Sequence, residues 1–115
     1  MIETDGKQYD LEKRTFEFAK RARKFVKILP KSVVNIEDGK QLVRSSGSVG
    51  ANYIEANESL SKKDFFMRIK ICRKEAKESR YWLELIESDN PEKEVLLSEA
   101  KELTNIFGAI VRNAK

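Results

Sequence analysis

Hydrophobic residues recur at intervals of three and four positions in four separate stretches of the chain. This spacing places apolar side chains on one face of an α-helix. Four amphipathic segments joined by short connectors predict an all-α fold, arranged as an antiparallel up-down four-helix bundle. The predicted helices span about residues 10–29, 38–60, 62–88 and 91–113.

The first predicted helix has candidate residues for both of its ends. Asp10 is expected to cap its N-terminus, because aspartate side chains accept hydrogen bonds from free helix N–H groups. Pro30 is expected to help end it, because proline disfavours helical geometry at the preceding residue. The connector from Pro30 to Lys40 then leads to the second helix.

The third and fourth predicted helices have clearer start signals. Ser61 precedes Asp64 by three positions, which resembles a capping box. Asn90 is followed by Pro91 and Glu92, so a capping side chain, a proline at the first helical position and an acid in the first turn coincide. These residues predict where both helices begin.

The stretch from Ser45 to Ala51 holds three serines, two glycines and one alanine. A phosphate-binding P-loop would need a preceding strand and a Gly-Lys-Ser/Thr ending, and neither is present. The bare GxxG from Gly47 to Gly50 also matches some RNA-binding loops, which sit between helices in a mixed fold. The helical register of the apolar positions from Leu42 to Leu60 continues through the stretch without a break. Because each mid-helix glycine costs about 1 kcal/mol relative to alanine, we interpret it as a surface for close helix packing.

The third predicted helix is apolar on two sides. One stripe runs from Phe65 to Ile86 and includes Cys72, which we interpret as a small core residue rather than a reactive thiol. The second stripe indicates a buried helix or an oligomer interface, with scattered surface hydrophobic residues as the alternative. The candidate interface residues are Met67, Ile71, Trp82 and Leu85.

The 115 residues are sufficient for one domain, residues 1–115, with a single core. No 18-residue apolar run is present, so no membrane span is expected. The N-terminal segment is polar and lacks the apolar core of a signal peptide. The only cysteine, Cys72, has no partner for an internal disulfide, which suits a reducing compartment. We therefore expect a cytoplasmic protein.

The residue types argue against catalysis and metal binding. The chain has no histidine, so the commonest general base and the Glu-x-x-His pairs of di-iron bundles are missing. One cysteine excludes a cysteine-rich metal site. We predict a non-enzyme without cofactor or metal; a ligand in a pocket lined by Glu55, Asn57 or Glu78 would favour an enzyme. The acids considered for acid/base pairs are expected to be solvated or ion-paired, and they are Glu55, Glu58, Glu75, Glu78 and Glu84.

Positive charge is concentrated on particular helices. The net charge is +4, and the segment from Lys20 to Lys27 has five basic residues and no acidic one. Such a stripe attracts phosphate backbones without reading sequence, although a plain solvated lysine face is the alternative. Phe16 and Tyr9 are candidates for stacking on bases or, for Phe16, for an oligomer contact. The candidate nucleic-acid-binding residues are Lys13, Lys20, Arg21, Arg23, Lys24 and Lys27.

The central segment, residues 41–86, resembles the bacterial four-helix-bundle family also called the 23S rRNA intervening-sequence proteins. The similarity extends more loosely to the outer helices through length and pattern. Its pieces are Gln41-Leu42-x-Arg44-Ser45, Ser48-Val-Gly-Ala-Asn52-Tyr53, Ser61-Lys-x-Asp64-Phe65 and Glu75-Ala-x-Glu78-Ser79-x-Tyr81-Trp82-Leu83-Glu84-Leu85.

This resemblance implies a four-helix bundle that assembles as a barrel-like homopentamer. The family is also similar to the basic pentameric accessory protein of diversity-generating retroelements, which binds nucleic acid and a reverse transcriptase. Two hypotheses follow. The first is a non-enzymatic homo-oligomer, with a pentamer favoured, that binds RNA or DNA, RNA in particular. The second is a protein-interaction scaffold, for example an accessory to a reverse transcriptase.

Overall fold

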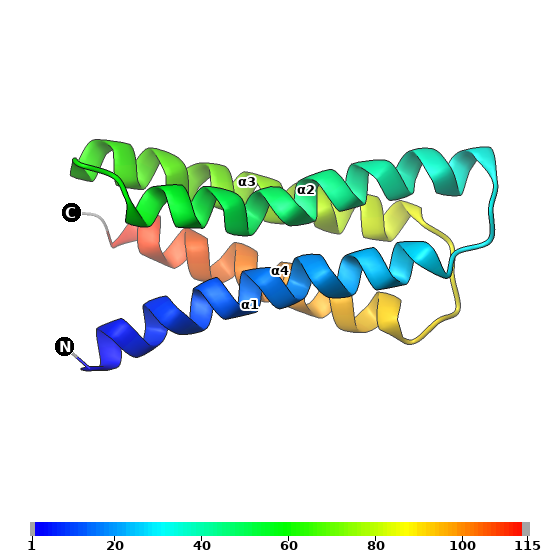
Figure 1. Cartoon of the computed structure of the whole chain (residues 1–115), viewed down its shortest axis with the longest axis horizontal. Helices are drawn as coiled ribbons and strands as arrows, with labels where there is room; N and C mark the ends of the chain where they lie inside the picture. Colours follow the sequence, from blue (N-terminus) through cyan, green and yellow to red (C-terminus); the bar gives the residue numbers. More distant parts are fainter. Residues whose placement is uncertain (1, 114–115) are drawn as a thin grey trace.

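The computed structural model describes the backbone of residues 2–113 and the side chains of residues 10–113. Four α-helices follow one another: α1 (Ile2–Lys27), α2 (Val33–Asn57), α3 (Lys62–Leu85) and α4 (Glu92–Arg112). Consecutive helices run in opposite directions, so the bundle has the predicted antiparallel up-down order (Figure 1). The bundle measures 46 × 24 × 20 Å along its principal axes.

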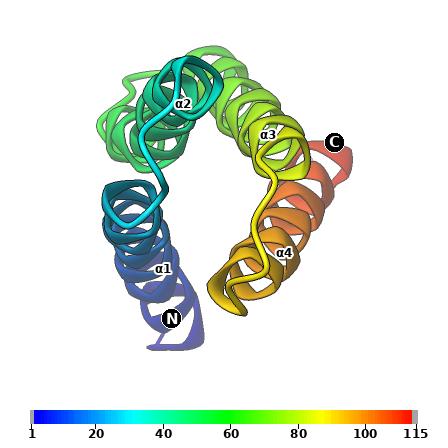
Figure 2. The same cartoon turned by 90° about the vertical axis from the view of Figure 1, so that its right-hand side faces the viewer.

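The helices are arranged around the bundle in chain order. Each one packs against its neighbours in sequence, and α1 also meets α4. Figure 2, a view along the bundle, shows that the separation between α1 and α4 is the widest of the four. The side between α1 and α4 is therefore the most loosely packed.

The predicted apolar faces meet in one core. Cys72 lies in this core and is fully buried, and burial raises the pKa of its thiol to about 12. This confirms Cys72 as a packing residue, because a thiol with such a pKa holds its proton at neutral pH. The largest fully buried side chains are Phe18, Phe25, Phe107, Leu42, Ile69, Leu83, Ile86, Leu96 and Leu103.

The small-residue stretch lies in the middle of α2 and packs closely on both neighbouring helices. At Gly50, an added Cβ would lie only 2.9 Å from Thr15 Oγ1 of α1. On the other side, Ser45 Oγ lies 2.9 Å from Ser79 Oγ of α3, and both serines are fully buried. The prediction of a helix-packing surface is confirmed.

The ends of α1 differ from the prediction. The helix begins at Ile2, so Asp10 lies inside it and is not its cap. It ends at Lys27 instead of Leu29 because the next two N–H groups bond three residues back. Ile28 N donates to the Phe25 carbonyl (3.3 Å) and Leu29 N to the Val26 carbonyl (3.2 Å). This tight last turn leads into Pro30.

The helix α2 begins at Val33, five residues before the predicted start at Asp38. Ser32 is its N-cap, with an Oγ that accepts the Asn35 N–H at 3.1 Å. The apolar residues of this first turn face solvent, so the periodicity of the buried face did not reveal it. The helix ends at Asn57, and Leu60, predicted on its apolar face, is fully exposed beyond it.

The start signal of α3 is confirmed. That of α4 is confirmed in part, because the helix begins at Glu92 and Pro91, predicted as its first residue, lies at the N-cap position. Ser61 Oγ accepts the Asp64 N–H at 3.1 Å, and Asn90 Oδ1 accepts the Glu92 N–H at 2.8 Å. The helix α3 ends at Leu85, three residues before the predicted end, and buried Ile86 follows it. The bounds of α4 agree with the prediction to within one residue at each end.

Candidate nucleic-acid interface

The outer face of α1 carries a row of lysines, which we call the α1 lysine stripe: Lys13, Lys20, Lys24 and Lys27. Spacings of seven, four and three residues place them on one side of the helix, away from the core, and all four are exposed. None of them forms an ion pair within the part of the chain that the structure describes. Their charges are therefore available to an anionic partner.

An aromatic ring accompanies this stripe. Phe16 is 62% exposed, and Lys20 Nζ lies 5.9 Å from its ring centroid, within the range of a cation–π contact. An exposed aromatic ring beside lysines suits stacking on a nucleic-acid base. The side chain of Tyr9, the other stacking candidate, lies outside the described residues.

The two predicted arginines of this region point elsewhere. Arg21 forms a bidentate ion pair with Glu92 of α4, with Nε–Oε2 and Nη2–Oε1 distances of 2.7 and 2.9 Å. Arg23 donates to the Ala19 carbonyl at 3.1 Å and lies over Gly47 of α2. The structure thus gathers four of the six predicted residues on one open face. It pairs Arg21 with α4 and leaves Arg23 bonded within α1, beside Gly47 of α2.

Long charged side chains bridge α1 and α4. Arg14 donates to both carboxylate oxygens of Glu99, at 3.0 and 2.8 Å, and to Glu102 at 3.0 Å. The hydrogen bond with Glu99 contributes most to raising the pKa of Arg14. An open groove of about 690 Å³ lies alongside these pairs. Its lining mixes both signs of charge, so it does not offer a polyanion a uniformly positive surface.

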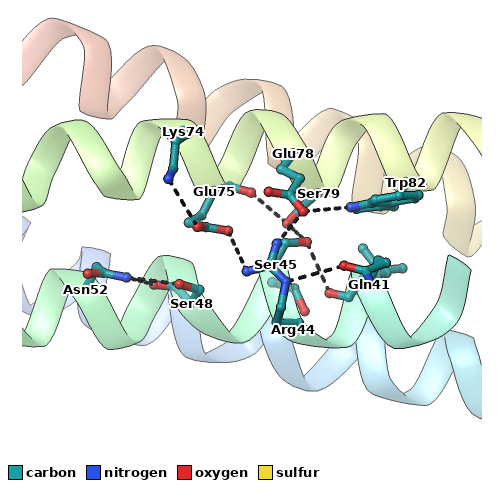
Figure 3. Close-up of polar contacts among 12 residues, drawn as sticks. Gln41, Arg44, Ser45, Ser48, Asn52, Lys74, Glu75, Glu78, Ser79 and Trp82 are labelled. Atoms are coloured by element: carbon teal, nitrogen blue, oxygen red, sulfur yellow. Dashed lines mark hydrogen bonds and ion pairs between the residues drawn. The ribbon is translucent and has the colours of Figure 1, made fainter. Parts of the chain in front are cut away.

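The opposite side of the bundle holds a polar network, which we call the α2–α3 polar cluster: Arg44, Ser45, Glu75, Glu78, Ser79 and Trp82. Figure 3 shows that these side chains meet between the two helices. Arg44 forms ion pairs with Glu75, at 3.3 Å, and with Glu78. Trp82 Nε1 donates to Glu78 at 3.0 Å, and this bond, followed by those from Arg44, lowers the pKa of Glu78.

The prediction that these glutamates are ion-paired is confirmed for Glu75, Glu78 and Glu84, the last of which pairs with Arg80 at 3.4 Å. Sequence reasoning missed that Glu75 is buried and that its partner belongs to α2. The signal was present, because Arg44, Glu75 and Glu78 all belong to the segments that carry the family resemblance. Every buried side-chain nitrogen and oxygen among the described residues has a hydrogen-bond partner.

The second apolar stripe of α3 is only partly open to solvent. Met67 and Leu85 are 50% and 45% exposed, whereas Ile71 and Trp82 are half-buried. Trp82 packs against the core, and its ring centroid lies 5.0 Å from that of Tyr81, which is 54% exposed. The exposed part of this face consists of Met67, Tyr81 and Leu85.

Two classes of site have no counterpart within the described residues. No three His, Cys, Asp or Glu side chains of that part of the chain are grouped as they would be around a metal ion. Among the same residues, no helix combines the length and the apolar character needed to cross a bilayer.

The fold and the charged faces together define an all-α four-helix bundle whose open features are basic and apolar surfaces. Comparison with family models identifies the family: residues 7–111 match the model described as "23S rRNA-intervening sequence protein". The chain belongs to this family.

A solved structure has the same fold. It is the crystal structure of a protein of unknown function from the S23 ribosomal protein family of Bacteroides thetaiotaomicron, 30% identical in sequence, with a TM-score of 0.81. The match covers 93% of this chain and 99% of the other. Comparison with curated proteins yields no match.

Proposed function

We propose that this protein is a non-enzymatic homo-oligomer of the cytoplasm that binds nucleic acid, RNA in particular, through the α1 lysine stripe. The observation that carries the proposal is the row of four exposed lysines without ion pairs, next to the exposed ring of Phe16. Lysines in such a row neutralise successive phosphates and hold a strand without reading its sequence. The family is named after an intervening sequence of 23S rRNA, which favours RNA over DNA.

Assembly would multiply this binding. Met67, Tyr81 and Leu85 expose apolar surface on α3, and packing them against a second copy would remove it from water. A ring, with five copies favoured by the family resemblance, repeats the stripe around its circumference. Several weak contacts on one strand then combine into a stronger one.

The direct test is RNA binding by a charge-reversed stripe. We expect Lys20→Glu, Lys24→Glu and Lys27→Glu together to weaken binding of a mixed-sequence RNA at least tenfold, with unchanged helical content by circular dichroism. The matched control reverses three exposed lysines on other helices, Lys62, Lys63 and Lys101, and has the same net charge. Equal RNA affinity of the two triple variants, measured across a salt series, would contradict the proposal.

The oligomer is tested separately. We expect Met67→Glu with Leu85→Glu to shift the sedimentation coefficient from that of a ring to that of a monomer. The control pair is Ile54→Glu with Leu60→Glu, which places the same charges at exposed apolar positions of α2 and the α2–α3 connection. A wild-type chain that sediments as a monomer would remove assembly from the proposal.

A second candidate function, a protein-interaction scaffold, is favoured by one end of the bundle. Around the α1–α2 connection, Ile28, Val33 and Val34 are 61%, 79% and 63% exposed. The neighbouring Lys27 and Lys31 are also exposed, so this surface fits a partner segment with both apolar and acidic residues. Binding to a reverse transcriptase encoded beside the gene, lost on Val33→Glu with Val34→Glu, would support the scaffold.

A further inference from the structure

Two arginines differ from all the others in the chain. The sequence has eight arginines, and six of them donate a hydrogen bond to another group. Arg73 of α3 and Arg112 of α4 have no such partner within the described residues. Both are exposed. A guanidinium is always charged and prefers a carboxylate or phosphate partner, so an unpartnered pair needs an explanation.

The two side chains converge although they lie on different helices. A Cβ added at Gly108 would lie 3.3 Å from Arg73 Nε and 3.4 Å from Arg112 Nη1. The two nitrogens are therefore within about 7 Å of each other, by the sum of these distances. Because glycine has no side chain, both guanidinium groups reach the same spot on α4. Two like charges that approach each other without a carboxylate between them repel.

Lys70 adds a third positive charge at this point. It lines the same groove between α3 and α4, together with Arg73, Gly108, Val111 and Arg112, and the groove has a volume of about 440 Å³. Lys70, Arg73 and the exposed Lys77 follow one another at three- and four-residue spacing along α3. No acidic residue lines the groove.

We propose that Lys70, Arg73 and Arg112 form a binding site for a phosphate group, which lies between the two guanidiniums above Gly108. An anion there replaces the mutual repulsion of the cations with two charge-assisted contacts, and arginine forks match the geometry of phosphate oxygens. The phosphate belongs either to a polynucleotide backbone, in which case the inference rests on the proposed function, or to a free phosphate compound.

The first experiment uses inorganic phosphate as the probe and the amide of Gly108 as the reporter, in a ¹⁵N NMR titration of the full chain. We expect phosphate to shift the Gly108 amide and the Arg73 and Arg112 Nε–H signals. Arg73→Gln with Arg112→Gln should weaken binding about tenfold or more, because it removes two charge-assisted contacts. The control, Lys62→Gln with Lys63→Gln, removes the same charge and should bind as the wild type does. Equal affinity of the two double variants would overturn the site.

The second experiment identifies the source of the phosphate with a single-stranded RNA. If one backbone phosphate occupies the site, the Arg73→Gln/Arg112→Gln variant should show a salt slope of log Kobs smaller by about 0.7. RNA binding equal to that of the Lys62→Gln/Lys63→Gln control would exclude the backbone while leaving the proposed function intact. If the wild type does not bind RNA, the proposed function fails, and a positive phosphate titration then assigns the site to a free phosphate compound.

Gly108→Ala tests the site without a risk of unfolding, because alanine is the stronger helix former. Its methyl group would occupy the spot on which both guanidiniums converge. Arg73 Nε, at 3.3 Å, would have to shift by a few tenths of an ångström, whereas Arg112 Nη1, at 3.4 Å, would be in ordinary contact. We expect phosphate affinity to fall two- to threefold while the melting temperature stays the same or rises. Unchanged phosphate affinity with the methyl group in place would contradict the geometry of the site.

Discussion

The two sides of the bundle are held together in different ways. Between α2 and α3, small side chains let the helices approach closely, and Ser45 and Ser79 meet in a fully buried contact. Between α1 and α4, the helices lie further apart, and long side chains such as Arg14 and Arg21 span the distance to glutamates. One side is a packed interface with buried polar groups, and the other is bridged by ion pairs that are partly buried, as for Arg14 and Glu99, or exposed, as for Arg21 and Glu92.

The difference indicates where the stability of the fold resides. Close packing between α2 and α3 removes apolar surface from water and places polar contacts where water does not compete. Exposed ion pairs contribute only about 0–1 kcal/mol each, because water screens them and both side chains lose freedom. We therefore expect the α1–α4 side to open at a lower free energy than the α2–α3 side.

The largest expected difference in stability is between two serine-to-leucine substitutions, one on each side of the bundle. Ser79→Leu inserts a large side chain into the closed α2–α3 contact and should lower the free energy of unfolding by about 3 kcal/mol. Ser98→Leu places the same side chain on the exposed lining of the α1–α4 groove and should change it by about 0.5 kcal/mol or less. Urea denaturation of both variants measures the contrast, and similar losses would refute it.

A smaller effect is expected for Arg44→Met. This substitution leaves Glu75, whose side chain is only 8% exposed, without its partner from α2. We expect a loss of about 1–2 kcal/mol, less than for a fully buried pair because Arg44 is half exposed. Adding Glu75→Gln should restore part of this stability by removing the buried charge. A double variant less stable than Arg44→Met alone would show that the pair matters through packing instead.

We expect the α2–α3 polar cluster to make the free energy of unfolding depend on pH in the acid range. The pKa of folded Glu78 is lowered, first by the Trp82 hydrogen bond and then by Arg44. Its contribution is therefore fully present above the ordinary carboxyl pKa of 4.5 and is lost as the pH falls through the lowered folded pKa. Glu78→Gln should reduce the loss of stability as the pH falls, and Trp82→Phe should reduce it less. Urea midpoints between pH 7 and pH 3 measure the effect, and parallel curves for wild type and Glu78→Gln would argue against it.

The smallest expected effect is that of Arg21→Met on the α1–α4 side. The ion pair between Arg21 and Glu92 is bidentate but exposed, so its loss should cost about 0.5 kcal/mol. Because salt screens exposed charges, the difference from wild type should disappear in about 1 M NaCl. A cost as large as that of Arg44→Met, or one insensitive to salt, would remove the distinction between the two sides.

Local patterns were sufficient for the elements and for the core. Three- and four-residue spacing identified four helices and placed Cys72 inside. The capping role of Ser61 and the polar contact of Asn90 with the first N–H of α4 followed from residue type alone. The same method failed at Val33 and Leu60. Periodicity reports only the face that a helix buries, and exposed hydrophobic residues carry no such information. The first turn of α2 was missed for this reason.

The candidate sites were only partly predictable. The α1 lysine stripe lies within one helix, so its spacing alone revealed an open face of four lysines. Arg21 belongs to the same basic segment, yet its partner, Glu92, lies 71 residues away. Sequence alone gave no reason to separate this arginine from the lysines around it.

By itself, the sequence determined which residues form helices, which face of each is apolar and where the helices are basic, because these properties depend on neighbours within a few positions. Only the tertiary structure decided which charged side chains form ion pairs and which have no oppositely charged partner. The Arg44–Glu75 pair and the convergence of Arg73 and Arg112 above Gly108 depend on how far one helix is shifted along and turned against another. That relative placement is set by the packing of the whole core, and no local spacing encodes it.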